Sequence, residues 1–320
     1  MKKLLVLSLA TLFIATISCK KVEDDPVAGT SAYKTMTNYM VDNNMDLPDL
    51  LASWIVGAPA TVADVPAFIA TYDIIDIRSA QDFANGHIEG AVNSTLSGIL
   101  AAAANTTKPI LVACYTGQTA GHAVVALKLS GYEAKVLKNG MSGWRADLAS
   151  PWESNSGPVN GITAIGSPNW VTTGTAALTT FGDPTLTASG DGAAMLAARV
   201  QEMLNNGFKG VTNTDVLNNP SNYFINNYWD QVDVDTYGNI AGAYRAKPLS
   251  ITGGEMNNLD PSEIVVTYCW TGQTSSMVTA YLNVLGFNAQ SLKFGTNGMI
   301  YTDLHSHQFV TPTVDLPVVP

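Results

Sequence analysis

The sequence predicts an α/β protein made of two copies of one unit, each a mostly parallel sheet with helices on both faces. Two observations support this fold class. The segment Cys114-Tyr-Thr-Gly-Gln-Thr119 returns 155 residues later as Cys269-Trp-Thr-Gly-Gln-Thr274. In both copies an apolar, β-branched run precedes the cysteine, and an apolar helical pattern follows it and ends at glycine. Strands that alternate with helices favour a parallel sheet covered on both sides.

The chain starts with a segment typical of a secretory signal. Lys2 and Lys3 precede Leu4–Ile17, an apolar stretch of 14 residues. As a helix it would be about 21 Å long, shorter than the ~30 Å hydrocarbon core of a bilayer. Ser18 and Cys19 close this stretch and resemble the bacterial lipobox, in which the cysteine becomes the lipidated N-terminus. The alternative is an ordinary signal peptide in which this cysteine has no role.

The lipobox resemblance implies an address in the bacterial cell envelope. We expect a lipoprotein signal peptide over 1–19, lipid on Cys19 and a charged, flexible tether over 20–32. The folded part would then be held at the outer membrane, on its periplasmic or its surface face.

The repeat sets the expected domain boundaries. The first unit spans 33–150 and the second, which departs more from the shared motifs, spans 193–310. Between them lies a linker, 151–192, rich in Gly, Ser, Thr, Asn and Pro. It contains two short extended pieces, Trp170–Thr173 and Thr185–Ala188, that could form a β-ribbon bridging the two domains. The proline-rich tail, 311–320, is expected to be extended.

Local patterns place the secondary structure around each cysteine. In each unit a strand ends at the cysteine, a helix follows it, and a second strand comes after the glycine that ends the helix. The expected elements are strand 110–113, helix 122–130 and strand 134–137 in the first unit, and strand 264–267, helix 277–285 and strand 289–292 in the second.

Composition excludes several classes of function. The net charge is −10 and no basic cluster is present, so nucleic acid and anionic lipid headgroups are poor candidate partners. Three cysteines are too few for a disulfide scaffold. The pair His305 and His307 has no third ligand near it in the sequence, so we expect neither a metal nor a cofactor.

The loop after each cysteine indicates thiol chemistry. A short glycine-containing turn between a buried strand and a helix directs successive backbone N–H groups inward, which forms an anion-binding nest. Gly117 would supply the left-handed backbone conformation that such a turn requires. The N–H groups and the helix dipole stabilise a thiolate, so we expect the pKa of the Cys114 thiol to be lowered. The hydroxyl groups of Thr116 and Thr119 would add donors to the nest.

Further motifs in the first unit resemble the rhodanese, or thiosulfate sulfurtransferase, family. Asp76-Ile-Arg78 is similar to the family's Asp-x-Arg, and Phe83 with Gly86-His-Ile-Glu-Gly-Ala-Val-Asn93 is similar to its Gly-His-Ile-x-Gly-Ala signature. Gly140-Met-Ser-Gly-Trp144 is similar to the motif that closes the domain. The resemblance implies two rhodanese-like domains and an enzyme that moves sulfane sulfur through a cysteine persulfide.

The resemblance also assigns roles to residues of both units. It implies nucleophiles at Cys114 and Cys269. The rest of each loop would bind the substrate: Tyr115, Thr116, Gly117, Gln118, Thr119 and Ala120 in the first unit, and Trp270, Thr271, Gly272, Gln273, Thr274 and Ser275 in the second. Supporting roles fall to Asp76, Arg78 and His87, the first two as an ion pair at the end of a strand and the histidine as a packing or capping residue.

One residue of each loop excludes the phosphatases that use a similar cysteine loop. Their cysteine loop carries an arginine six residues after the cysteine, where it clamps the phosphate. Here those positions hold Ala120 and Ser275.

The second unit keeps its cysteine loop but loses most of the other motifs. Asn227-Tyr-Trp229 stands in place of Asp-x-Arg, and Asn239, Ala241 and Met299 replace the histidine, the glutamate and the tryptophan of the first unit. Cys114 is therefore the stronger candidate nucleophile.

The partners implied are a small sulfur donor and a thiophilic acceptor or thiol protein. Because neither loop contains Lys or Arg, we expect weak capture of the thiosulfate dianion. Two alternatives remain open: a non-catalytic rhodanese-fold binding or scaffold module of the cell envelope, and a redox sensor that joins Cys114 to Cys269.

Overall fold

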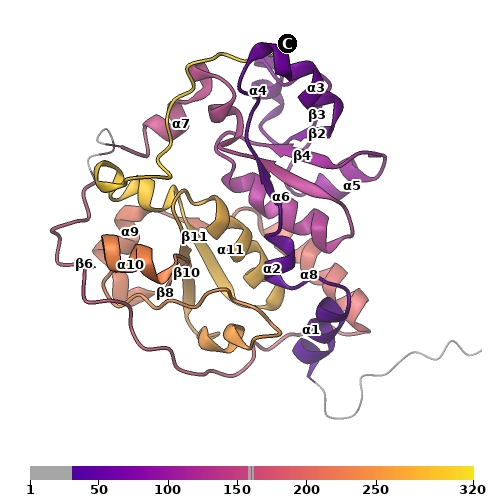
Figure 1. The fold of residues 1–320 in the computed structure, drawn as a ribbon. Coiled ribbons are helices and arrows are strands. Elements are labelled where there is room, and N and C mark those ends of the chain that lie inside the picture. The colour runs from indigo at the N-terminus through magenta and orange to yellow at the C-terminus, as the bar shows by residue number, and fades with distance from the viewer. Residues whose placement is uncertain (1–30, 158–159, 161) are drawn as a thin grey trace, which may run out of the picture.

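The computed structural model describes residues 31–157, 160 and 162–320. The expected signal peptide, the lipidation site at Cys19 and most of the tether lie outside these residues. Two parallel sheets, one in each unit, are the main features of the described part (Figure 1). The predicted α/β class, with two sheets of parallel strands, is confirmed.

The first sheet has the strand order β1-β5-β4-β2-β3, and every neighbouring pair is parallel. Its strand β4 alternates between two cores. Ile110 and Val112 belong to a core that includes α6, whereas Leu111 and Ala113 pack with α3 and Trp144 on the other face. Helices therefore cover both faces of this sheet. The strands are β1 (Ile55–Val56), β2 (Asp73–Asp76), β3 (Val92–Asn93), β4 (Ile110–Ala113) and β5 (Ala134–Leu137).

The second sheet repeats this order as β7-β11-β10-β8, again with parallel pairs. The position that corresponds to β3 is reduced to a single parallel bridge between Asn226 and Tyr244. The strands are β7 (Gly210–Val211), β8 (Phe224–Asn227), β10 (Ile264–Tyr268) and β11 (Asn288–Leu292).

The helix after each cysteine begins four residues earlier than predicted. Gly117 and Gly272 adopt left-handed φ angles of 78° and 76° and act as N-caps, so the loop closes one turn sooner. The helices are α1 (Ala32–Asp42), α2 (Leu47–Leu50), α3 (Val65–Ala70), α4 (Ala80–Asn85), α5 (Ile99–Ala103), α6 (Gln118–Leu129), α7 (Ser150–Glu153), α8 (Gly192–Asn206), α9 (Asn213–Asn218), α10 (Gln231–Tyr237) and α11 (Gln273–Leu285).

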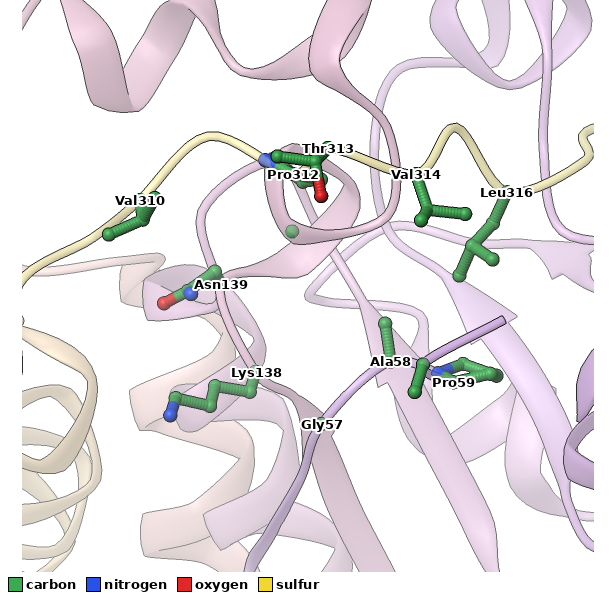
Figure 2. Close-up of a pocket in the computed structure, with 12 residues that line it drawn as sticks. Gly57, Ala58, Pro59, Lys138, Asn139, Val310, Pro312, Thr313, Val314 and Leu316 are labelled. Atoms are coloured by element: carbon green, nitrogen blue, oxygen red, sulfur yellow. The ribbon is translucent and has the colours of Figure 1, made fainter. Parts of the chain in front are cut away.

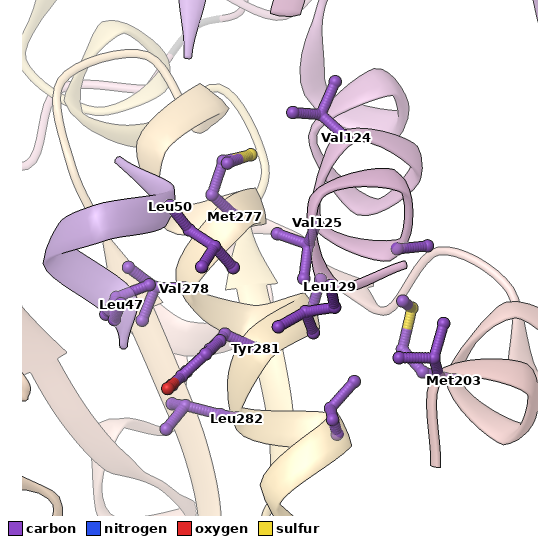
Figure 3. Close-up of a cluster of buried hydrophobic side chains, with 14 of the residues drawn as sticks. Leu47, Leu50, Val124, Val125, Leu129, Met203, Met277, Val278, Tyr281 and Leu282 are labelled. Atoms are coloured by element: carbon purple, nitrogen blue, oxygen red, sulfur yellow. The ribbon is translucent and has the colours of Figure 1, made fainter. Parts of the chain in front are cut away.

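The two cysteine helices pack against each other in a core that both units share. Figure 3 shows side chains of α6 facing those of α11, with α2 and α8 completing the cluster. Gly121 permits the close crossing of α6 and α11, since a Cβ there would lie 2.7 Å from the Ser276 hydroxyl oxygen. The labelled members of this core are Leu47, Leu50, Val124, Val125, Leu129, Met203, Met277, Val278, Tyr281 and Leu282.

Each unit pairs with a segment that lies outside its own span of the chain. The tail, 311–320, crosses to the first unit and ends beside α4 (Figure 1), where Val319 forms an antiparallel bridge with His87. The Trp144 indole N–H donates to the Pro317 carbonyl at 2.9 Å. In the same way strand β6 (Trp170–Val171) of the linker pairs with β9 (Asn239–Ile240) of the second unit.

Of the two extended pieces expected in the linker, only the first forms a strand. This strand, β6, takes β9 as its partner, and Thr185–Ala188 forms no strand. The reason is that the buried Trp170 side chain joins the core of the second unit, and its indole N–H donates to the Tyr237 carbonyl at 2.8 Å.

Within the part of the chain that the structure describes, every helix is too short or too polar to cross a membrane.

Candidate active site

Cys114 follows the last residue of β4 at the carboxyl edge of the first sheet. Its side chain is buried, and two backbone amides point at the sulfur. Sγ accepts hydrogen bonds from the amide of Gly117 at 3.2 Å and from that of Ala120 at 3.4 Å. These donors come from the loop and from the first turn of α6, which is the geometry of an anion nest.

Burial nevertheless dominates the proton affinity of this thiol. Burial raises the pKa of Cys114 above its usual range, the amides of Ala120, Thr116 and Gly117 act in the opposite direction, and the Asp76 carboxylate raises it further. The expectation of a lowered pKa is therefore wrong. A loop of amides was deduced from local sequence, whereas the apolar surroundings that outweigh it come from the tertiary structure.

A glycine-containing turn supports the loop from behind. The amides of Met141 and Ser142 donate to the carbonyls of Cys114 and Tyr115 at 2.7 and 2.9 Å. A Cβ on Gly140 would overlap the Cys114 carbonyl oxygen, and Gly140 has a left-handed φ of 60°. Only glycine fits this close approach without strain.

The Asp76–Arg78 pair forms a buried platform beside the loop. The guanidinium Nη2 lies 2.6 Å from Asp76 Oδ2 and donates to the Gly86 carbonyl at 2.7 Å, and both side chains are 1 % exposed. The guanidinium also lies over the Tyr115 ring, 5.3 Å from its centroid. The pair thus positions Tyr115 at the mouth of the loop. The Asp76 carboxylate neutralises the positive charge of Arg78.

His87 contacts the neighbouring helix and the tail. Its ring stacks on Phe83 with a centroid separation of 3.7 Å, and Nδ1 lies 2.9 Å from the Phe83 carbonyl oxygen. Its backbone pairs with Val319. These contacts make His87 a packing residue.

Cys269 has a similar but poorer nest. Sγ accepts from the Ser275 amide at 3.3 Å and lies 3.7 Å from the Ser275 hydroxyl oxygen. In place of the platform, Trp229 packs on Trp270 with ring centroids 4.3 Å apart, and His307 stacks on the same ring at 4.7 Å. The mouth of this loop is therefore aromatic, and among the residues that the structure describes no ion pair takes the place of Asp76 and Arg78 there.

The remaining loop residues fall into two groups. Those that are partly exposed and could meet a ligand are Tyr115, Thr116, Thr119, Trp270, Thr271 and Thr274; those that are buried are Gly117, Gln118, Ala120, Gly272, Gln273 and Ser275. Asn139 and Phe294, both in left-handed conformations, were missed by the sequence analysis although they contact the opposite loop. The Asn139-Gly140 dipeptide was the available signal, because Asn-Gly favours such turns.

A cavity of about 280 Å³ opens next to the supporting turn (Figure 2). The tail bounds it on one side and Gly57–Ala60 on the other, with Lys138 and Asn139 between them. Within residues 31–157, 160 and 162–320, no three His, Cys, Asp or Glu side chains are grouped in a way that could hold a metal ion.

Comparison with known proteins places the first unit in a family. The profile of the rhodanese-like domain matches residues 61–147. A protein named thiosulfate sulfurtransferase GlpE, from Stutzerimonas stutzeri, is 38 % identical over 84 residues, which are 25 % of this chain and 76 % of that protein.

Two solved structures are also similar to part of this chain, at lower identity. A rhodanese-related protein from Thermoplasma volcanium is 22 % identical, with a TM-score of 0.25, over 28 % of this chain and 89 % of that one. A rhodanese homologue from Thermus thermophilus is 24 % identical, with a TM-score of 0.22, over 27 % of this chain and 95 % of that one. From the match to the family profile and the identity to the Stutzerimonas relative, this chain belongs to the rhodanese family.

Proposed function

We propose that the protein is a rhodanese-type sulfurtransferase that carries sulfane sulfur as a persulfide on Cys114. The observation that supports this most directly is the pair of amides, from Gly117 and Ala120, that point at Cys114 Sγ. The same donors can stabilise a thiolate before the reaction and a persulfide anion after it.

The reaction proceeds in two displacement steps. The thiol first loses its proton to solvent. The thiolate attacks the outer sulfur of the donor, so the Sγ–S bond forms while the donor's own bond to that sulfur breaks, and its electron pair leaves with the rest of the donor. An acceptor thiolate or cyanide then attacks the same sulfur, and the Sγ–S bond breaks with its electron pair returning to Sγ. This is covalent catalysis with ping-pong kinetics.

The charges around the loop favour a neutral or protein-bound donor. Neither loop carries a cation, and the guanidinium of Arg78 is already paired with Asp76. The net charge of −10 repels a dianion from solution. We therefore propose a persulfide or polysulfide donor and a thiol acceptor in preference to thiosulfate.

The site of action is proposed from the leader. Lipidation of Cys19 would hold the protein in the bacterial envelope, on the periplasmic or surface face of the outer membrane. Intact mass of the protein purified from membranes tests this, because Cys19→Ser should remove both the lipid mass and the membrane association.

Matched serine variants test the sulfur chemistry. The purified protein should gain the mass of one sulfur atom at Cys114 after exposure to a polysulfide, and cyanide should remove it. Cys114→Ser should abolish that turnover, whereas Cys269→Ser reports whether the second loop contributes. If wild type and Cys114→Ser transfer sulfur at equal rates from every donor, the enzyme proposal is lost.

A non-catalytic binding module of the envelope is the second candidate. The raised pKa of the buried Cys114 thiol favours it, since a protonated thiol is a poor nucleophile. This function would survive Cys→Ser changes at both loops in a pull-down from envelope extracts. A persulfide on the protein as purified would count against it.

A further inference from the structure

The glutamine of each cysteine loop reaches across to the opposite unit. Gln273 Oε1 accepts from the Asn139 amide at 2.8 Å, and its Nε2 donates to Asn139 Oδ1 at 2.9 Å. In the other direction Gln118 Oε1 accepts from the Phe294 amide at 2.9 Å. Both glutamines are nearly fully buried, at 3 % and 2 % exposure for Gln118 and Gln273. Their amide groups are therefore occupied by protein and turned away from any substrate.

Each glutamine also touches the opposing loop itself. A Cβ on Gly117 would overlap Gln273 Oε1, and a Cβ on Gly272 would lie 2.5 Å from Gln118 Oε1. The glycines thus have a second purpose besides their left-handed backbone, which is to leave room for the glutamine of the other unit.

The residues that are hydrogen-bonded to these glutamines begin the turns that support the cysteines. Asn139 immediately precedes the turn whose amides bind the carbonyls of Cys114 and Tyr115. Phe294 has the same place in the second unit, where the amides of Thr296 and Asn297 donate to the carbonyls of Cys269 and Trp270, both at 3.0 Å. A loop and its support are therefore tied together through a side chain from the other loop.

We propose that Gln118 and Gln273 are crossed positioning residues, so that Gln273 sets the geometry of the Cys114 loop and Gln118 sets that of the Cys269 loop. The loop of the second unit then has a function even if Cys269 never carries sulfur. This explains why the second unit keeps its cysteine loop intact while it lacks the Asp-x-Arg pair and the tryptophan of the first. The link to catalysis rests on the proposed function; the link to thiol reactivity stands without it.

The experiment compares Gln118→Met with Gln273→Met, which keep side-chain length but remove the amide. Alkylation of each cysteine by iodoacetamide is followed by peptide mass spectrometry over a range of pH. Burial is the largest cause of the raised pKa of Cys114, so a loosened loop should react faster and at lower pH. Gln273→Met should speed alkylation of Cys114 about fivefold or more, and leave Cys269 within about twofold. Gln118→Met should instead speed alkylation of Cys269 and leave Cys114 within about twofold. Sulfur turnover at Cys114 should slow only in Gln273→Met.

Controls separate positioning from a general loss of stability. Asn139→Gly keeps the left-handed backbone and the amide donor but removes the side-chain oxygen, so it should reproduce part of the Gln273→Met effect at Cys114. If Gln273→Met does not fold, this variant alone decides the question. Equal acceleration of both cysteines, acceleration of the cysteine in the altered loop, or no change would each overturn the proposal. A crossed alkylation pattern without sulfur loading of the wild type would instead refute the sulfurtransferase function and leave the crossed positioning intact.

Discussion

Acid should weaken the protein through one buried histidine between the two units. His122, on α6, is fully buried; its Nδ1 lies 3.0 Å from the Ser276 hydroxyl oxygen, and its ring packs edge-on against Phe208 at 4.9 Å. Its Nε2 accepts from the Lys209 amide at 3.5 Å, which requires the neutral ring. Burial lowers the pKa of His122 from 6.5 to about 3.

The sign and the size of the effect follow from linkage. Between the two pKa values the unfolded chain binds a proton that the folded protein does not, so stability falls as the pH falls. Each pH unit in this window corresponds to about 1.4 kcal/mol, so the free energy of unfolding should drop by about 2 kcal/mol between pH 7 and pH 5. The carboxylates whose pKa is lowered start from ordinary values of 3.8 for Asp and 4.5 for Glu, so they titrate mainly below pH 5, outside the measured range: Asp73, Asp82, Asp147, Asp230 and Glu255.

Urea unfolding at the two pH values measures this difference. The matched variant is His122→Met, because the repeat places Met277 at the equivalent position of α11. It should remove most of the difference between pH 7 and pH 5. If the wild type and His122→Met lose the same stability on acidification, the assignment to this histidine is refuted.

Three other changes have defined outcomes. Removing the tail should destabilise the first unit by about 3 kcal/mol, because the indole N–H of Trp144 loses its acceptor and buried apolar surface is exposed; hydrogen exchange should quicken in the first sheet but not in the second. Gly140→Ala should cost about 3 kcal/mol and distort the Cys114 loop, since the added Cβ overlaps a carbonyl oxygen, and unchanged alkylation of Cys114 would contradict this. Arg78→Met should cost about 3 to 5 kcal/mol in urea unfolding by leaving a buried carboxylate unpaired, and a loss under about 1 kcal/mol would show that the ion pair is not essential to the platform.

The parts that sequence predicted are those that local patterns determine. The run Ile110–Ala113 is a strand at the predicted residues because alternate members face two different cores. The left-handed glycine at 117 and the inward amides also follow from the loop alone. Asp76 and Arg78 form the ion pair that the motif indicates.

The parts that sequence missed depend on residues far apart in the chain. The bond between Gln273 and Asn139 spans 134 positions, and no pattern within either segment points to the other. The proton affinity of Cys114 depends on how deeply the folded protein buries the thiol, which the loop sequence does not encode. The partner of the linker strand β6 was missed for the same reason, since it lies in the second unit.

The first unit is completed by the C-terminal tail, and this affects how the chain can fold while it is synthesised. The acceptor of the Trp144 indole lies 173 residues further along, so the ribosome must make most of the protein before the first half can be completed. Ordinary two-domain chains can fold their leading half during translation, but here that half waits, with a tryptophan and a backbone edge exposed, for the final stretch to emerge. Such a nascent chain would need protection from aggregation, and cutting the gene between β6 and α8 would give two fragments, neither of which contains all the pieces of its own fold.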